Sequence, residues 1–149
     1  IDSPAYPKGL RERARVNERM DWVNTQLCID LAYGLAYPQI FDSHKRPHGD
    51  AQHATLQRGR ERARQWLRVM DEHMLGPGNN FLCGDTITIA DYHASSFVKL
   101  AEVIGSDLGA YPNVKHWLGR MKALTHWPQV YSVIDGFAAS FKGLPMATV

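Results

Sequence analysis

The chain has 149 residues, and its 17 basic and 15 acidic side chains leave a formal net charge of only +2 at pH 7. A nucleic-acid-binding domain usually gathers a larger basic excess on one face, and no apolar run here is long enough to span a membrane. We therefore expect neither nucleic acid nor a membrane as partner. Cys28 and Cys83 are far apart, which indicates reduced thiols in a cytoplasmic protein. The length suits one domain, residues 1–149.

The first half of the chain predicts two long helices. Apolar residues at spacings of three and four predict the first from about Gly9 to Tyr37, ending at Pro38 because proline cannot continue a helix. The second is expected from about Ala51 to Leu75, where a glycine- and asparagine-rich segment (76–80) stops it. The apolar stripe of the first helix consists of Val16, Met20, Val23, Leu27 and Leu31.

Three more helices are expected in the second half. One runs from Thr88 to about Ile104 and is apolar on most of its surface, which predicts a position at the centre of the fold. The others span about Pro112 to Leu124 and a short segment from Pro128, and each begins with a proline suited to a first turn. The tail after Gly143 shows no helical pattern. Five helices around a buried central one predict an all-α bundle.

The segment Thr88-Ile89-Ala90-Asp91 has the form of a capping box at the start of the central helix. In such a box the first hydroxyl and the fourth side chain each accept a hydrogen bond from the other residue's backbone N–H. Asp91 could instead be a catalytic carboxylate. A cap on a buried helix explains both polar residues together, so we predict structural roles for Thr88 and Asp91.

Three segments of the chain are informative as a set. They are residues 81–91 (Phe-Leu-Cys-Gly-Asp-Thr-Ile-Thr-Ile-Ala-Asp), residues 111–114 (Tyr-Pro-Asn-Val) followed by Trp117, and residues 13–18 (Arg-Ala-Arg-Val-Asn-Glu) followed by Trp22. In this combination they resemble the C-terminal helical domain of cytosolic glutathione transferases. The last segment is most similar to the theta-like and bacterial branches, and the resemblance covers nearly the whole chain.

The resemblance implies a two-domain parent enzyme. A thioredoxin-like N-terminal domain would bind the co-substrate glutathione and activate its thiol. The helical domain would supply most of the pocket for a small hydrophobic electrophile, and a homodimer surface. The implied activity is conjugation of glutathione to electrophiles in detoxification, or glutathione-dependent dehalogenation. Because the thiol-activating Ser, Tyr or Cys of the family lies in the thioredoxin-like domain, we assign no catalytic residue to residues 1–149 and expect them to be inactive alone.

A second face of the first helix lies away from its apolar stripe. At about 100° per residue, Trp22 shares that side with Arg15, Ile29 and Tyr33. Geometry alone allows more core, a dimer contact, or a cleft shared with another domain, where aromatic walls suit a small-molecule pocket. The matching tryptophan of theta-like transferases lines the active site. The resemblance therefore implies a substrate-binding surface of Arg15, Trp22, Thr25 and Ile29.

Two side chains on the first helix have alternative interpretations. Arg15 could attract the glutathione thiolate or its carboxylates, or form a surface ion pair with Glu12 or Glu18. Cys28 could be a nucleophile, but its sequence neighbours supply no base, which favours a buried and inert thiol.

Several histidines fall in the predicted loop after the first helix and near the start of the second. Metal sites need ligands at tight spacing, usually supported by a second Cys/His group, and the sequence offers neither. We therefore predict no metal cofactor at His44, His48 and His53.

A non-enzymatic function is the alternative. Some translation factors and synthetases carry a similar helical domain as a protein-interaction module. The sequence encoded upstream distinguishes the two. A thioredoxin-like segment with a cis-proline favours the enzyme, whereas a long segment of another kind, or a basic extension, favours the module.

Overall fold

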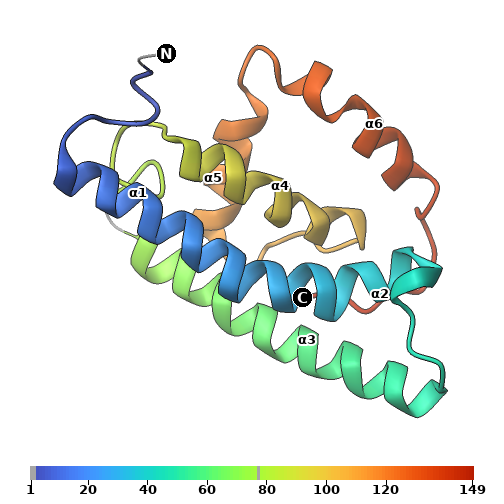
Figure 1. The fold of residues 1–149 in the computed structure, drawn as a ribbon. Coiled ribbons are helices and arrows are strands. Elements are labelled where there is room, and N and C mark those ends of the chain that lie inside the picture. Colours follow the sequence, from blue (N-terminus) through green and yellow to red (C-terminus); the bar gives the residue numbers. More distant parts are fainter. Residues whose placement is uncertain (1–2, 77) are drawn as a thin grey trace.

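The computed structural model describes residues 3–76 and 78–149. Extended pairing among them is limited to one bridge between Phe81 and Gly84, so the predicted all-α class is confirmed. In chain order the elements are α1 (Leu10–Trp22), η1 (Val23–Ala36), α2 (Tyr37–Ile40), η2 (Asp42–His44), α3 (Gly49–Val69), η3 (Met70–Met74), α4 (Ile89–Val103), α5 (Pro112–Lys122) and α6 (Trp127–Ala139). Figure 1 shows α3 and α6 on opposite sides of the bundle, with α4 between them.

The first long helix consists of α1, η1 and α2, which follow one another without a break (Figure 1). The predicted end at Pro38 is wrong, because the helix continues to Ile40. The turns before it are π-helical, and the Tyr37 N–H bonds to the Ala32 carbonyl five residues back. This wider turn leaves room for the proline ring, which a regular α-helical turn would exclude. The Gln39 side-chain amide donates to the Leu35 carbonyl at 3.0 Å, so this carbonyl close to Pro38 has a hydrogen-bond partner.

The first long helix and α3 run side by side, and their backbones touch at two glycines (Figure 1). A Cβ atom built on Gly59 would lie 2.3 Å from the carbonyl oxygen of Gly34. Only a hydrogen atom fits at Gly59, which is buried at this crossing. The π-helical η3 extends α3 to Met74, close to the predicted end, and residue 77 of the predicted stop lies outside the described residues.

The central position of α4 is confirmed. Ala94, Val98 and Ala101 are fully buried, and the helix packs against η1, α1, α5 and α6. These residues belong to one core cluster with Leu27 and Leu31 of η1. α4 therefore forms the central contact for α1, η1, α5 and α6.

The C-terminal tail, which shows no helical pattern, is nevertheless tied to the domain. Ala147 exchanges two hydrogen bonds with the Gln39 side chain, at 2.7 and 3.1 Å, and the Val149 N–H donates to Ser106 Oγ at 3.1 Å. Among the described residues, no helix is both long and apolar enough to cross a membrane.

Candidate functional site

One buried carboxylate fixes the start of α4. The Asp91 side chain is completely buried and accepts hydrogen bonds from the Thr88 N–H at 2.8 Å and the Thr88 hydroxyl at 3.0 Å. It also accepts from the Leu82 N–H at 2.8 Å and the Trp117 indole N–H at 3.0 Å. The capping box expected from the sequence is present. Because Asp91 also joins the preceding loop and α5, its geometry is that of a structural centre.

The wide turns of η1 decide which side chains share a face of the first long helix. Val23, Leu27, Leu31 and Leu35 follow one another at intervals of four, and each is at most 1% exposed. At 100° per residue, twelve residues would rotate a side chain by about 120° away from its first position. The wider π-helical turns rotate each residue by less than 100° and so counter this drift. Residues four apart therefore remain in one row along η1.

A second row faces α3. The Trp22 ring meets the edge of Trp66 with 6.0 Å between centroids, and the Trp66 indole donates to Asp30 Oδ2 at 2.7 Å. Arg62 lies 4.4 Å above the Trp66 ring and 3.6 Å from Asp30 Oδ2. Trp22 thus belongs to the seam between the first helix and α3, where Gly34 also lies.

A third row, formed by Thr25, Ile29, Tyr33 and Tyr37, is separate from Trp22. Ile29 and Tyr33 are each 53% exposed, and Thr25 is exposed with its hydroxyl donating to Asp21 O at 2.7 Å. The prediction that Trp22 shares a side with Ile29 and Tyr33 assumed regular α-helical rotation throughout. The π-helical stretch turns these residues away from α3.

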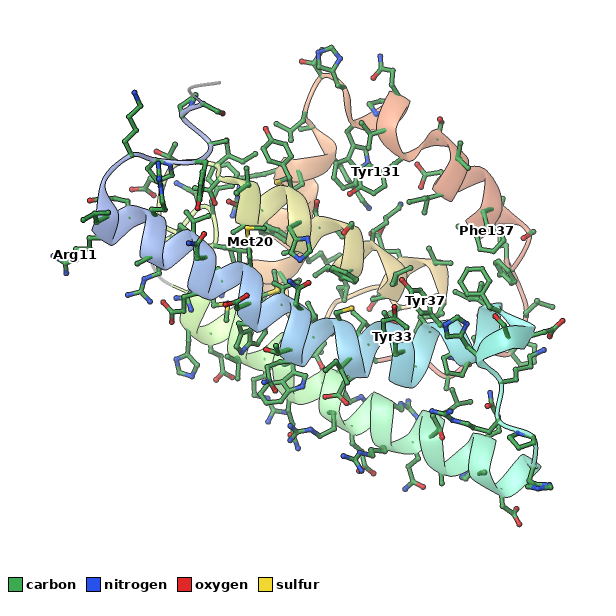
Figure 2. All side chains as sticks on the ribbon, in the orientation of Figure 1. Arg11, Met20, Tyr33, Tyr37, Tyr131 and Phe137 are labelled. Atoms are coloured by element: carbon green, nitrogen blue, oxygen red, sulfur yellow. The ribbon has the colours of Figure 1, made fainter. Side chains whose placement is uncertain are left out.

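An aromatic cluster continues the third row at the far end of η1. Its six members, each within 6 Å of a neighbouring ring, are Tyr33, Tyr37, Phe41, His44, Phe137 and Phe141. The Phe137 ring of α6 stacks on Phe41, with centroids 5.9 Å apart and planes 14° apart. Figure 2 shows Tyr33 and Tyr37 on the first long helix and Phe137 above them on α6. An apolar surface therefore joins two helices that are distant in the sequence.

Arg15 lies at the other end of the first helix. Its guanidinium contacts Glu18 Oε2 at 2.8 Å, and both side chains are more than half exposed. Arg15 also lines a cavity of about 660 Å³ with Cys83 and Thr88. The structure therefore distributes the four predicted substrate-binding residues over three places. Arg15 lies near the loop before α4, Trp22 packs against α3, and Thr25 and Ile29 lie in the third row.

The thiols and the buried phenols are poorly ionised. Burial raises the pKa of the Cys28 thiol, and burial together with the neighbouring Cys28 and Tyr33 raises the pKa of Tyr37. Burial is also the largest influence on Cys83 and raises its pKa. Neither cysteine has the lowered pKa of an activated nucleophile, in agreement with an inert Cys28. His44, one of the loop histidines, packs in the aromatic cluster; within the described chain no three His, Cys, Asp or Glu residues form a metal-binding group.

Comparison with known proteins identifies the family. The model of the glutathione S-transferase C-terminal domain family matches residues 29–124. The chain belongs to this family. Its fold is similar to a possible glutathione S-transferase of Rhodopseudomonas palustris, with 24% identity and a TM-score of 0.71 over 84% of this chain and 54% of that one. A Sinorhizobium meliloti glutathione S-transferase matches with 20% identity and a TM-score of 0.72 over 86% and 56% of the two chains.

A third structure, a glutathione transferase homologue from Sulfitobacter with bound glutathione, matches with 14% identity and a TM-score of 0.69, over 89% of this chain and 67% of that one. This glutathione transferase C-terminal domain thus spans between half and two thirds of the length of these structures.

The aromatic cluster was not predicted as a site. Its signal in the sequence is the interval of four from Tyr33 to Phe41 and again from Phe137 to Phe141. Regular α-helical rotation would spread the two steps from Tyr33 to Phe41 over about 80°, which makes the row less evident in a standard helical projection. The Phe41 and Phe137 segments meet only because the end of α6 packs near the end of α2. No local sequence pattern specifies this long-range contact.

Proposed function

We propose that the protein containing this domain is a glutathione transferase that conjugates glutathione to small hydrophobic electrophiles or removes halide from them. Family membership supports the transferase class, and the bound glutathione of the Sulfitobacter homologue supports glutathione as the co-substrate. A thioredoxin-like N-terminal domain of the same parent would bind glutathione and activate its thiol. The helical domain would contribute the electrophile wall and the surface of a cytoplasmic homodimer.

The exposed third row of the first long helix is the observation that best supports this proposal. A domain whose core residues are almost completely buried nevertheless leaves Ile29 and Tyr33 half exposed beside an aromatic cluster. An apolar surface of this kind, with the Thr25 and Tyr33 hydroxyls as polar groups, has the composition of a small-molecule site. We place the electrophile against this row.

Arg15 and Trp22 keep separate roles in the proposal. The Arg15–Glu18 ion pair is exposed and therefore weak, so Arg15 can exchange Glu18 for a glutathione carboxylate at little cost. Trp22 would support the site from the α3 side, through the Asp30–Trp66 contact, more than it would form the wall itself.

Steady-state turnover with glutathione and a chlorinated aromatic acceptor tests the function. The 149-residue chain should give no turnover above background, whereas the full-length parent should be active. In the parent, Arg15→Ala should lower kcat/KM about tenfold, because a glutathione carboxylate loses a charged contact that positions the co-substrate. Arg58→Ala, which removes an exposed arginine of α3, is the matched control. A parent that is inactive with every acceptor, or whose upstream segment is not thioredoxin-like, would favour the interaction-module alternative.

A further inference from the structure

The contact between α6 and α4 is incomplete at both ends. A cavity of about 410 Å³ lies at the start of α6, between Tyr92 and Ser95 of α4 and Trp127 and Tyr131 of α6. A second cavity, of about 320 Å³, lies between the end of α4 and the end of α6. Trp127 and Tyr131 near the start of α6 are buried in the core cluster. Close packing is the rule in protein interiors, so at the two cavities α6 gains less from shape complementarity.

An ion pair between a buried lysine and a half-exposed aspartate joins the two helices between these cavities. Lys99 Nζ lies 2.7 Å from Asp135 Oδ1, and the Lys99 side chain is only 11% exposed. Glu102 accepts a second hydrogen bond from Lys99 at 3.2 Å and also pairs with Lys122 of α5. Burial lowers the pKa of Lys99, but the two carboxylates together raise it above its usual value, so Lys99 remains charged at neutral pH.

The charges of this network balance only while α6 is in place. Two lysines, Lys99 and Lys122, face two carboxylates, Glu102 and Asp135. Without Asp135, the two lysines share Glu102 alone, and one buried positive charge loses half of its compensation. Asp135 therefore ties the position of α6 to a charge that α4 cannot neutralise fully by itself.

The same helix carries the far wall of the aromatic cluster. Phe137 follows Asp135 by two residues, and its ring stacks on Phe41, which contacts Tyr37. Any displacement of α6 from Lys99 moves Phe137 relative to the first long helix. The outer face of α6 offers no alternative support, because Val130 and Val133 are 66% and 80% exposed.

We propose that Lys99 and Asp135 form a positioning pair that holds α6 in place and thereby sets, through Phe137, the width of the electrophile surface between α6 and η1. This inference rests on the proposed function for the identity of the ligand. The attachment of α6 itself can be measured without turnover.

The first measurement is amide hydrogen exchange on the 149-residue chain. Asp135→Ala should make the amides of α6 exchange about tenfold faster or more, although alanine is the better helix former. Asp135→Glu should restore most of the protection. Lys122→Met removes a charge from the same network without touching α6 and should leave α6 exchange unchanged. Equal exchange in Asp135→Ala and the unaltered chain would overturn the proposal.

The second measurement is steady-state kinetics of the same variants in the full-length parent. Asp135→Ala should change KM for a bulky aromatic acceptor at least threefold more than KM for a small one, because the wall at Phe137 shifts. If the amides of α6 exchange faster but KM changes equally for both acceptors, Asp135 has only a structural role and the positioning assignment is overturned. A parent inactive with every acceptor would reject the proposed function, while the exchange result would still decide whether the pair holds α6.

Discussion

α4 begins in a fully satisfied hydrogen-bond network. α6 packs on the core through Trp127 and Tyr131 near its start, and further along it depends on an ion pair between two cavities. Both helices use a buried charge, but they use it differently. Asp91 is surrounded by four donors from three parts of the chain, and Lys99 depends on a carboxylate from the helix that it holds. We expect the first arrangement to hold the centre of the fold rigidly and the second to leave one wall adjustable.

This difference also separates stability from function along the first long helix. On the side of η1 that faces the core, Leu27, Leu31 and Leu35 are fully buried. On the side that continues toward α6, Ile29 and Tyr33 are half exposed. Substitutions at the Asp91 centre should therefore act on the free energy of unfolding. Substitutions in the exposed row should act on ligands. The predictions below test this division, beginning with the largest effect.

Removal of the Asp91 carboxylate should have the largest effect on stability. Asp91→Ala leaves the Leu82 N–H, the Thr88 N–H and the Trp117 indole without their acceptor inside the protein, and should cost about 3–5 kcal/mol of unfolding free energy. Urea melts measure the loss. Asp85→Ala, an exposed acid in the same loop, should change stability by less than about 0.5 kcal/mol. Similar losses in the two variants would contradict the central role of Asp91.

The glycine contact between the first helix and α3 should be the next most sensitive place. Gly59→Ala puts a Cβ within 2.3 Å of a backbone carbonyl, so the helices must separate at a cost of about 2–4 kcal/mol. Gly119→Ala in α5 is the matched control, since nothing lies within 4 Å of its Cβ position. That variant should stabilise the domain by up to about 1 kcal/mol. If thermal melts show that both variants shift the melting temperature in the same direction from that of the unaltered chain, the close crossing of the two helices is wrong.

Loss of the Thr88 hydroxyl should cost less than loss of the carboxylate it contacts. Thr88→Ala keeps the backbone donor to Asp91 and removes the hydroxyl, with its 3.0 Å bond to the carboxylate and its half of the capping box. The expected loss is about 1–2 kcal/mol, the usual range for a helix cap. Thr88→Ser, which keeps the hydroxyl, should recover most of it in the same urea melts. An unchanged midpoint for Thr88→Ala would mean that Asp91 alone holds the helix start.

The sequence was sufficient to predict the parts of the fold that depend on local signals. Glycine-rich stops, prolines in first turns and the capping box at Thr88 identify the ends of helices, and the nearly continuous apolar surface of α4 identifies the centre. These signals require knowledge of only a few neighbouring residues. Five helical segments, with the third one buried at the centre, therefore follow from pattern alone.

The candidate site was harder to predict because it depends on turns that the sequence does not mark. Nothing in Val23–Ala36 distinguishes a π-helical stretch from a regular helix, yet this stretch lets the helix pass Pro38 and separates Ile29 from Trp22. Arg15 was expected beside Trp22, and its alternative, an ion pair with Glu18, is the contact observed. Rotation accumulates along a helix, so a small error per turn becomes a wrong face after three turns.

A final prediction contrasts the two rows that regular rotation would have merged, and it concerns the smallest change in stability. Ile29→Ala removes a side chain that is 53% exposed and should alter the unfolding free energy by less than about 0.5 kcal/mol. Trp22→Ala removes a ring packed on Trp66 and should cost about 1–3 kcal/mol. In the full-length parent the order should reverse. Ile29→Ala should raise the acceptor KM several-fold, because an apolar acceptor loses buried contact area, whereas Trp22→Ala should change it less.

The two variants are compared by urea melts of the 149-residue chain and by kinetics of the parent, with Leu10→Ala as control. Leu10 is 85% exposed on α1 and lies outside the third row, so its loss should change neither quantity. If Trp22→Ala has the larger kinetic effect and leaves stability intact, Trp22 contacts the electrophile in the assembled enzyme. In that case the parent must bring a ligand to the α3 side of the helix, and the exposed row of η1 is free for another partner.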